Sequence, residues 1–337
     1  MKRFAIFIFV GSFFLPLSFS PGSADGAAVP YYKDKVINFI VGYNPGGGYD
    51  RVARLLAKHL PKHIPGNPVI LVQNMPGASS MIAANYVYNI AKPNGLTIGV
   101  IDRGLAFAQL LKAEGSKFDL RKFAWIGSAA VESTVLVLRS ELPYKTVDDI
   151  AKAKSPLMIG NLGLANNSTH FLFFQKEFLG YNYKFIAYPA SADAMLAVER
   201  KEVDGMGVAY STAKLLIDRG VVRPMIRGRV SEVGIENLPV DEDLTKDKKA
   251  KTLMAMRSAP DMMGRPYVAP PGTPEAVMNV LREGFARVAK DPALQQDAKN
   301  NKMTLTYVSD KEVQKLLDYI LNQPPDMVSE FSKYIKF

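Results

Sequence analysis

Three consecutive glycines in the segment Tyr43-Asn44-Pro45-Gly46-Gly47-Gly48-Tyr49-Asp50 are the strongest indication of a binding site in the sequence. Glycine has no Cβ atom, so a ligand can approach the backbone of such a loop closely. An apolar stretch typical of a strand (36–41) precedes the loop, and apolar residues at helical spacing (49–60) follow it. Free N–H groups and the helix dipole at that helix start favour an anion such as a carboxylate. We expect the contacts to be made by Tyr43, Gly46, Gly47, Gly48, Tyr49 and Asp50.

The glycine loop matches neither of the common nucleotide-binding motifs. A phosphate loop requires Lys and then Ser or Thr after its last glycine, whereas Tyr49 and Asp50 follow here, and a carboxylate would repel phosphate. The dinucleotide fingerprint requires a glycine where Arg51 stands. The alternative to a binding loop is a tight turn without a ligand, but three glycines exceed what such a turn needs. The sequence therefore favours a carboxylate site.

Two more candidate loops follow the next predicted strands, 68–73 and 96–101. Ligands of open α/β sheets bind beyond the carboxyl ends of the strands, so these loops are expected to meet the glycine loop. In the first of them, Pro76, Gly77, Ala78 and Ser79 offer N–H groups and a hydroxyl at a helix start, although ordinary helix capping explains them equally well. In the second, Arg103 can clamp a second carboxylate of the ligand, or it can pair with Asp102 or Asp50.

A second block of the chain repeats the strand–loop–helix pattern. A predicted helix (168–179) opens with Asn167, Ser168, Thr169 and His170, and Tyr188 and Ser191 follow the predicted strand 184–187. These six residues are expected to contact the ligand from the opposite side. Capping by the Asn, Ser and Thr side chains and packing of His170 are the alternatives.

The predicted elements that position these loops alternate between strands and helices in both blocks. The predicted strands are 36–41, 68–73, 96–101, 134–138, 157–160, 184–187 and 205–209, and the predicted helices are 49–60, 79–91, 146–151, 168–179 and 192–200. Such alternation predicts an α/β fold with mostly parallel sheets. The run 241–251 is expected to be solvated because its charges are mixed, and Thr273 is expected to cap a helix with Pro274 at its first position.

Composition argues against catalysis and metal binding. The chain has no cysteine, which excludes disulfides, thiol nucleophiles and zinc sites built on thiolates. It contains neither a Gly-x-Ser-x-Gly elbow nor a His-Glu-x-x-His pair. His59 and His63 are four apart, but Pro61 lies between them, and both are expected to be exposed. The sequence predicts no enzyme, no cofactor and no metal.

The first residues predict an exported protein. Lys2 and Arg3 precede an uncharged apolar stretch and then a run of small residues, which is the pattern of a cleaved signal peptide over residues 1–28. We therefore expect a periplasmic location and no contact with nucleic acid. The net charge of +10 suits an anionic ligand, although simple solubility explains it as well.

Several short motifs, in this order, give the chain a family resemblance. They are Pro45-Gly46-Gly47-Gly48-Tyr49-Asp50, Ala53-Arg54, Asn74-Met75-Pro76-Gly77-Ala78, Lys92-Pro93-Asn94-Gly95, Trp125-Ile126-Gly127, Leu142-Pro143-Tyr144-Lys145-Thr146, Ser168-Thr169-His170 and Pro271-Gly272-Thr273-Pro274. With them the sequence resembles the substrate-binding receptors of the tripartite tricarboxylate transporters, the Bug-type periplasmic receptors. The resemblance covers nearly the whole chain after residue 28. It departs from the family at Ala78-Ser79-Ser80, where Ala-Gly-Gly is more usual.

The resemblance implies a type II periplasmic-binding fold, with two doubly wound α/β domains, a hinge and a central cleft that closes like a Venus flytrap. We expect domain 1 to comprise residues 29–133 plus 258–337, and domain 2 to comprise residues 134–257. The implied ligand is a di- or tricarboxylate or an aromatic acid, and the implied partners are the permease subunits of a membrane transporter. The receptor is expected to be monomeric. The alternatives are a sensory partner protein and an exported enzyme that uses the same cleft.

Overall fold

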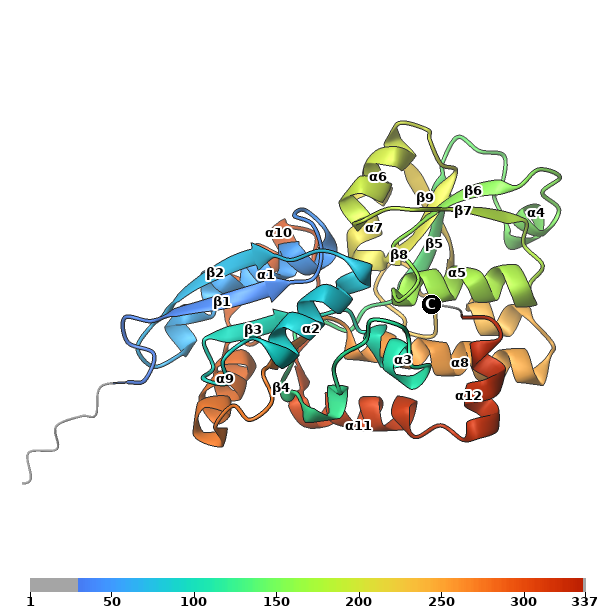
Figure 1. Ribbon diagram of the computed structural model, residues 1–337. Helices are drawn as coiled ribbons and strands as arrows, with labels where there is room; N and C mark the ends of the chain where they lie inside the picture. Colours follow the sequence, from blue (N-terminus) through green and yellow to red (C-terminus); the bar gives the residue numbers. More distant parts are fainter. Residues whose placement is uncertain (1–29, 336–337) are drawn as a thin grey trace, which may run out of the picture.

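The computed structural model describes residues 30–335, which form two lobes, each built around one β-sheet (Figure 1). The first sheet has the order β11-β4-β10-β3-β1-β2 and the second β7-β6-β8-β5-β9. The first sheet contains β1 (Val36–Val41), β2 (Val69–Asn74), β3 (Thr97–Val100), β4 (Ala124–Ser128), β10 (Pro266–Ala269) and β11 (Val308–Ser309). The second contains β5 (Thr134–Arg139), β6 (Leu157–Asn161), β7 (Tyr183–Ala187), β8 (Gly205–Ala209) and β9 (Val222–Arg227). The predicted signal peptide lies outside the described residues.

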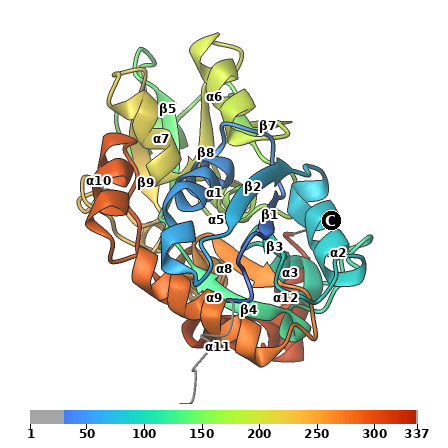
Figure 2. The same cartoon turned by 90° about the vertical axis from the view of Figure 1, so that its left-hand side faces the viewer.

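Helices cover both sheets, so the chain has the predicted α/β class (Figure 2). The helices are α1 (Gly48–His59), α2 (Met81–Asn89), α3 (Leu105–Leu110), α4 (Val147–Ala151), α5 (Asn167–Phe178), α6 (Ser191–Glu199), α7 (Tyr210–Ile217), α8 (Lys248–Met263), α9 (Glu275–Val288), α10 (Pro292–Asn300), α11 (Asp310–Leu321) and α12 (Pro325–Ser332). Among residues 30–335, no helix has both the length and the apolar composition needed to span a membrane.

The inner strands of each sheet are buried on both faces, which explains why they are apolar almost throughout. In β1, Phe39 and Val41 belong to one apolar cluster, whereas Ile40 belongs to the cluster on the other face. In β5, Val135 and Leu136 face opposite clusters in the same way. Side chains alternate between the faces of a strand, so a strand covered on both sides needs apolar residues at every position.

The sheets are mixed, whereas mostly parallel sheets were predicted. Strand β1 pairs in parallel with β2 and β3, as expected, but β10 lies antiparallel between β3 and β4. In the second sheet β5 lies antiparallel between β8 and β9. The chain enters the second lobe through β5 and returns to the first through β10. Each of these connecting strands runs against its neighbours.

Two helices join the lobes. Helix α8 contacts α11 of the first lobe and α5 of the second, and residue 258, the predicted boundary, falls inside it. In α12 the ring of Phe331 lies 4.7 Å from that of Phe107 in α3 and 5.2 Å from that of Phe174 in α5. One apolar cluster therefore includes residues of both lobes.

Other local predictions have mixed outcomes. Helix α4 begins with a capping box, in which the Asp149 backbone N–H donates to the Thr146 hydroxyl and the Asp149 carboxylate accepts from the Thr146 N–H. The expected cap at Thr273 is wrong, because its hydroxyl donates to the Pro270 carbonyl and α9 begins after Pro274. The expectation that run 241–251 is solvated fails at Asp241, which is fully buried and paired with Arg257.

Candidate functional site

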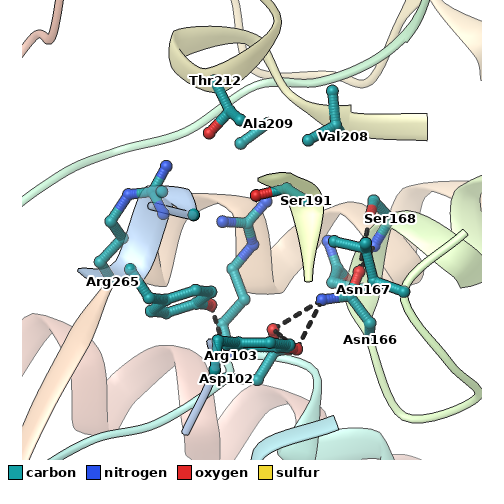
Figure 3. Close-up of a pocket in the computed structure, with 15 residues that line it drawn as sticks. Asp102, Arg103, Asn166, Asn167, Ser168, Ser191, Val208, Ala209, Thr212 and Arg265 are labelled. Atoms are coloured by element: carbon teal, nitrogen blue, oxygen red, sulfur yellow. Dashed lines mark hydrogen bonds between the residues drawn. The ribbon is translucent and has the colours of Figure 1, made fainter. Parts of the chain in front are cut away.

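A cavity lies between the two lobes, at the carboxyl ends of β1, β3, β6 and β8 (Figure 3). The first lobe contributes the glycine loop, the residues after β3 and an arginine that precedes β10. The second lobe contributes the end of β8 and the starts of the three segments that follow β6, β7 and β8. We call this space the anion chamber, and its lining residues are Tyr43, Gly47, Gly48, Tyr49, Asp102, Arg103, Leu162, Asn166, Asn167, Ser168, Ser191, Val208, Ala209, Thr212 and Arg265.

Four helix N-termini converge on the anion chamber, those of α1, α5, α6 and α7. Within the described part of the chain, no side chain caps α1, α6 or α7. The first N–H of α7, that of Tyr210, donates to the Ser133 carbonyl at 2.8 Å, so the first N–H groups of α1 and α6 are those available to a ligand. Helix α5 is capped by Asn166, whose side chain accepts from the Ser168 N–H at 2.9 Å. Free N–H groups at helix starts bind anions, and four helix dipoles pointing at one space favour negative charge there.

Two buried arginines add positive charge to the chamber. The Arg103 guanidinium donates to the Asp261 carboxylate at 2.8 Å, and that of Arg265 donates to Glu132 at 2.7 Å. The Arg265 guanidinium also lies 5.1 Å from the centre of the Tyr49 ring. The buried Nε of Arg103 has no hydrogen-bond partner among the described residues. Both arginines are thus held in place by carboxylates outside the chamber and still line it.

Asp261 is the centre of the hydrogen-bond network behind Arg103. Its Oδ1 accepts from Arg103, from the Thr134 hydroxyl at 2.8 Å and from the Asn167 side-chain amide at 2.7 Å. Its Oδ2 accepts from Arg257 at 3.1 Å. The network joins the first lobe, the start of β5 and the start of α5, so it links the position of Arg103 to the arrangement of the lobes.

A second set of hydrogen bonds connects the lobes beside the chamber. The Tyr43 hydroxyl donates to Asp102 at 2.7 Å, and the Asn166 amide donates to both Tyr43 and Asp102 at 2.8 Å (Figure 3). Burial raises the pKa of the Asp102 carboxyl, although Arg103 and the donors around it oppose that shift. The N–H of Gly104 satisfies the other carboxylate oxygen. Asp102 therefore serves to hold the two lobes together.

The structure brings about half of the predicted site residues into the anion chamber. Those that line it are Tyr43, Gly47, Gly48, Tyr49, Arg103, Asn167, Ser168 and Ser191. Four others, Gly77, Ala78, Ser79 and Tyr188, line a separate cavity next to it. The partner predicted for Arg103 in the alternative reading, Asp102 or Asp50, is wrong, because the ion pair is made with Asp261.

Five predicted site residues line neither cavity: Gly46, Asp50, Pro76, Thr169 and His170. Asp50 turns back into its own lobe, where it accepts from the Gly46 N–H at 2.9 Å and pairs with Arg54. The Thr169 hydroxyl accepts from the Leu162 N–H. Burial lowers the pKa of His170 to about 4, and its Nε2 contacts the Leu164 carbonyl at 2.6 Å. These side chains shape the loops of the site.

The histidines expected to be exposed are also partly buried. His59 and His63 lie 2.9 Å from carboxylate oxygens of Asp297 and Asp291, respectively, and so connect α1 and the following turn to the α10 region. Within residues 30–335 no group of three or more side chains is arranged as metal ligands.

The sequence reasoning missed seven residues of the chamber as ligand contacts: Asp102, Leu162, Asn166, Val208, Ala209, Thr212 and Arg265. Most of them stand next to a predicted residue or at the end of a strand, so a wider window around each strand end would have included them. Arg265 is different, because it precedes its strand. Since β10 runs antiparallel to β3, its start lies at the carboxyl end of β3, where Tyr267 pairs with Val100.

Two α/β lobes around a cleft that is lined by helix N-termini define the class of type II periplasmic-binding-protein-like receptors. Residues 52–332 match the family described as "Tripartite tricarboxylate transporter family receptor", and the chain belongs to this family. The members of this family are receptors and not enzymes, and so is this chain.

Comparison with individual proteins agrees with this assignment. The chain is 26% identical over 341 residues to a UPF0065 protein of Bordetella pertussis, and the alignment covers 98% of each protein. Its fold is similar to that of the periplasmic binding protein BugD, with a TM-score of 0.73 at 22% identity over 90% of this chain and 98% of that one. It is also similar to MatC from Rhodopseudomonas palustris with bound malate, with a TM-score of 0.70 at 17% identity over 90% and 99%.

Proposed function

We propose that this protein is an extracytoplasmic receptor that captures a small carboxylate in the anion chamber and delivers it to the membrane subunits of a tripartite tricarboxylate transporter. One observation carries the proposal: the starts of four helices and two buried arginines meet in a single enclosed space. Hydrogen bonds from N–H groups and guanidinium groups to a carboxylate are charge-assisted and stronger than those between neutral groups. Because most of the lining residues are buried, these hydrogen bonds are less screened than at a surface.

The pairing of the charges around the chamber also favours an anion over a cation. Asp261 and Glu132 are engaged by arginines, and both oxygens of Asp102 already accept hydrogen bonds. A cationic ligand would therefore meet no free acceptor among these carboxylates and would face four helix N-termini. The available groups are chiefly donors: the first N–H groups of α1 and α6, the Nε of Arg103, and the hydroxyls of Ser191 and Thr212, with the Oδ1 of Asn167 as an unpaired acceptor.

The family and its relatives support the remaining parts of the proposal. The family is named for receptors of a tripartite transporter, and the similar protein MatC has malate, a small dicarboxylate, bound. BugD is described as a periplasmic binding protein, which supports a periplasmic location together with the signal peptide predicted from the sequence. We propose that the receptor acts as a monomer with two lobes corresponding to the two predicted domains.

Isothermal titration calorimetry of the purified protein tests the proposal. We expect one small carboxylate per chain to bind from a panel of mono-, di- and tricarboxylates and aromatic acids, and to be recovered unaltered. A matched pair of variants checks the site: Arg265→Gln removes a chamber cation, whereas Arg287→Gln removes an exposed one from α9. Only Arg265→Gln should weaken binding. Tight binding of amines or sugars with no binding of carboxylates would overturn the proposal.

A further inference from the structure

A second cavity, of about 470 Å³, adjoins the anion chamber. The side chains of Tyr43 and Leu162 line both spaces and therefore form the boundary between them. We call the second space the apolar chamber. Its lining residues are Tyr43, Gly77, Ala78, Ser79, Met81, Glu114, Leu162, Gly163, Leu164, Ala165, Ala187, Tyr188 and Pro189.

The two chambers differ in chemistry. The anion chamber has two arginines and four helix starts, whereas no lysine or arginine is among the lining residues of the apolar chamber. Its one charged lining residue is Glu114, which is acidic. The other side chains are chiefly aliphatic or aromatic, and among them Leu164 is 47% exposed.

We propose that the ligand is an amphipathic monocarboxylate, with its carboxylate in the anion chamber and an uncharged apolar body in the apolar chamber. This assignment rests on the proposed function and narrows it to a ligand class. A second carboxylate at the far end of the ligand would meet no cation there and would be repelled by Glu114. It would also lose hydration without gaining a partner. An alkyl chain or an aromatic ring is instead buried against Leu164 and the Tyr188 ring.

The loop from Gly77 to Ser80 positions the boundary between the chambers. Ala78, Ser79 and Ser80 have positive φ angles of 45°, 50° and 76°, which are unfavourable for residues other than glycine. The Ser79 hydroxyl donates to the Leu162 carbonyl of the other lobe at 3.1 Å. Strained backbone persists where the surroundings hold it, often at ligand sites. Here the conformation aligns Ser79 with Leu162 and so sets part of the boundary between the chambers.

Calorimetry with matched ligands tests the proposal directly. The probes are hexanoate against adipate, octanoate against suberate, and 4-methylbenzoate against terephthalate, in which only the far end differs. We expect the monocarboxylate of each pair to bind about tenfold or more tightly. From butanoate to octanoate, each added methylene should strengthen binding by up to roughly fourfold. Equal binding, or preference for the dicarboxylates, would overturn the ligand class and leave the proposed function standing. Binding of no carboxylate would overturn both.

Two variants test whether the apolar body of the ligand binds in the apolar chamber. Glu114→Arg places a cation in the apolar chamber and should raise the affinity for adipate or suberate relative to the matching monocarboxylate. Glu283→Arg makes the same charge change on α9, away from both chambers, and should leave the preference unchanged. Leu164→Ser should reduce the gain per methylene without weakening butanoate. An unchanged preference in Glu114→Arg together with an unchanged chain-length series in Leu164→Ser would place the ligand elsewhere.

Discussion

At Gly48 the absence of a side chain makes room for two groups of the anion chamber. A Cβ atom added there would overlap the Nη1 atom of Arg265 and lie 2.6 Å from the Thr212 hydroxyl. At Gly47 the added atom would lie 3.0 Å from the Ser191 hydroxyl, a milder contact. Both glycines therefore permit the first turn of α1 to approach the second lobe.

We predict that Gly48→Ala weakens carboxylate binding by on the order of tenfold or more, about 1.4 kcal/mol, because Arg265 must move and the lobes cannot close fully. Gly47→Ala should have a smaller effect. Neither change should lower the midpoint of thermal unfolding much, since neither φ angle lies in the left-handed range that favours glycine. Calorimetry and thermal melts measure both quantities. An unaffected affinity in Gly48→Ala would show that contact between α1 and α7 is not required for binding.

Arg103 contributes to the same chamber as the glycine loop, so its loss should affect every carboxylate alike. We predict that Arg103→Ala weakens hexanoate and adipate by a similar ~1.5–3 kcal/mol, the range for hydrogen bonds to charged groups. Titrating both ligands into both proteins gives a double-difference free energy, which should be close to zero. A selective loss of adipate binding would mean that Arg103 holds a second carboxylate.

His170 makes the folding free energy depend on pH. Burial lowers its pKa from the usual 6.5 to about 4, so the unfolded chain binds a proton more readily than the folded one. The stability linked to His170 is fully present above pH 6.5 and is lost as the pH falls toward 4, by about 3 kcal/mol. We predict that His170→Gln flattens the dependence in this window. Urea unfolding of both proteins from pH 7 to pH 4 measures it, and parallel curves would contradict this origin.

At the scale of elements, helix α12 fastens the two lobes to each other. Its Phe331 is fully buried between a ring of α3 and a ring of α5. We predict that Phe331→Ala lowers the free energy of unfolding by ~3–5 kcal/mol, because it leaves a cavity in the apolar cluster that the lobes share. The control is Tyr319→Ala on α11, a ring that is 52% exposed. Chemical denaturation of the two variants gives the comparison, and similar losses would argue against the shared cluster.

The elements that the sequence predicts best are those in which local signals and tertiary contacts agree. Strands β1 and β8 were predicted with their observed ends, because their apolar runs are bounded by glycine, polar or charged residues. Helix α8 was missed as an element. It contains Pro260, and its buried Arg257 and Asp261 make its inner face look polar. Only the tertiary network, in which these charges pair with each other and with Arg103, explains their burial.

The candidate site was predictable wherever it follows the rule that ligands bind at the carboxyl ends of parallel strands. Gly47, Gly48, Arg103 and Ser191 obey that rule. Arg265 does not, because β10 reverses the direction of the chain within the sheet. The separation of Gly77 and Tyr188 into a second chamber could not be predicted either, since it depends on how Tyr43 and Leu162 meet across the lobes.

At the scale of the whole molecule, the absence of cysteine allows a direct test of closure. A Cβ atom at position 47 would lie 3.0 Å from the Ser191 hydroxyl of the other lobe, so two cysteines there are near enough to form a disulfide. We predict that oxidised Gly47→Cys/Ser191→Cys exchanges ligand at least about tenfold more slowly than its reduced form. Stopped-flow measurements give the rates, and the single-cysteine variants are the controls. Equal rates in both redox states would mean that the ligand leaves without separation of these loops.

The hydrogen bonds from Asn166 and Asn167 to the first lobe join protein atoms only, so they can form with or without a solute between the lobes. A receptor that closes without a ligand would still present its closed shape to the transporter. It would therefore compete with loaded receptors for binding to the transporter. The rate of solute uptake would then depend on the fraction of closed receptors that carry ligand. An excess of receptor over solute would lower this rate instead of raising it. Uptake assays at increasing receptor levels and fixed solute should therefore pass through a maximum.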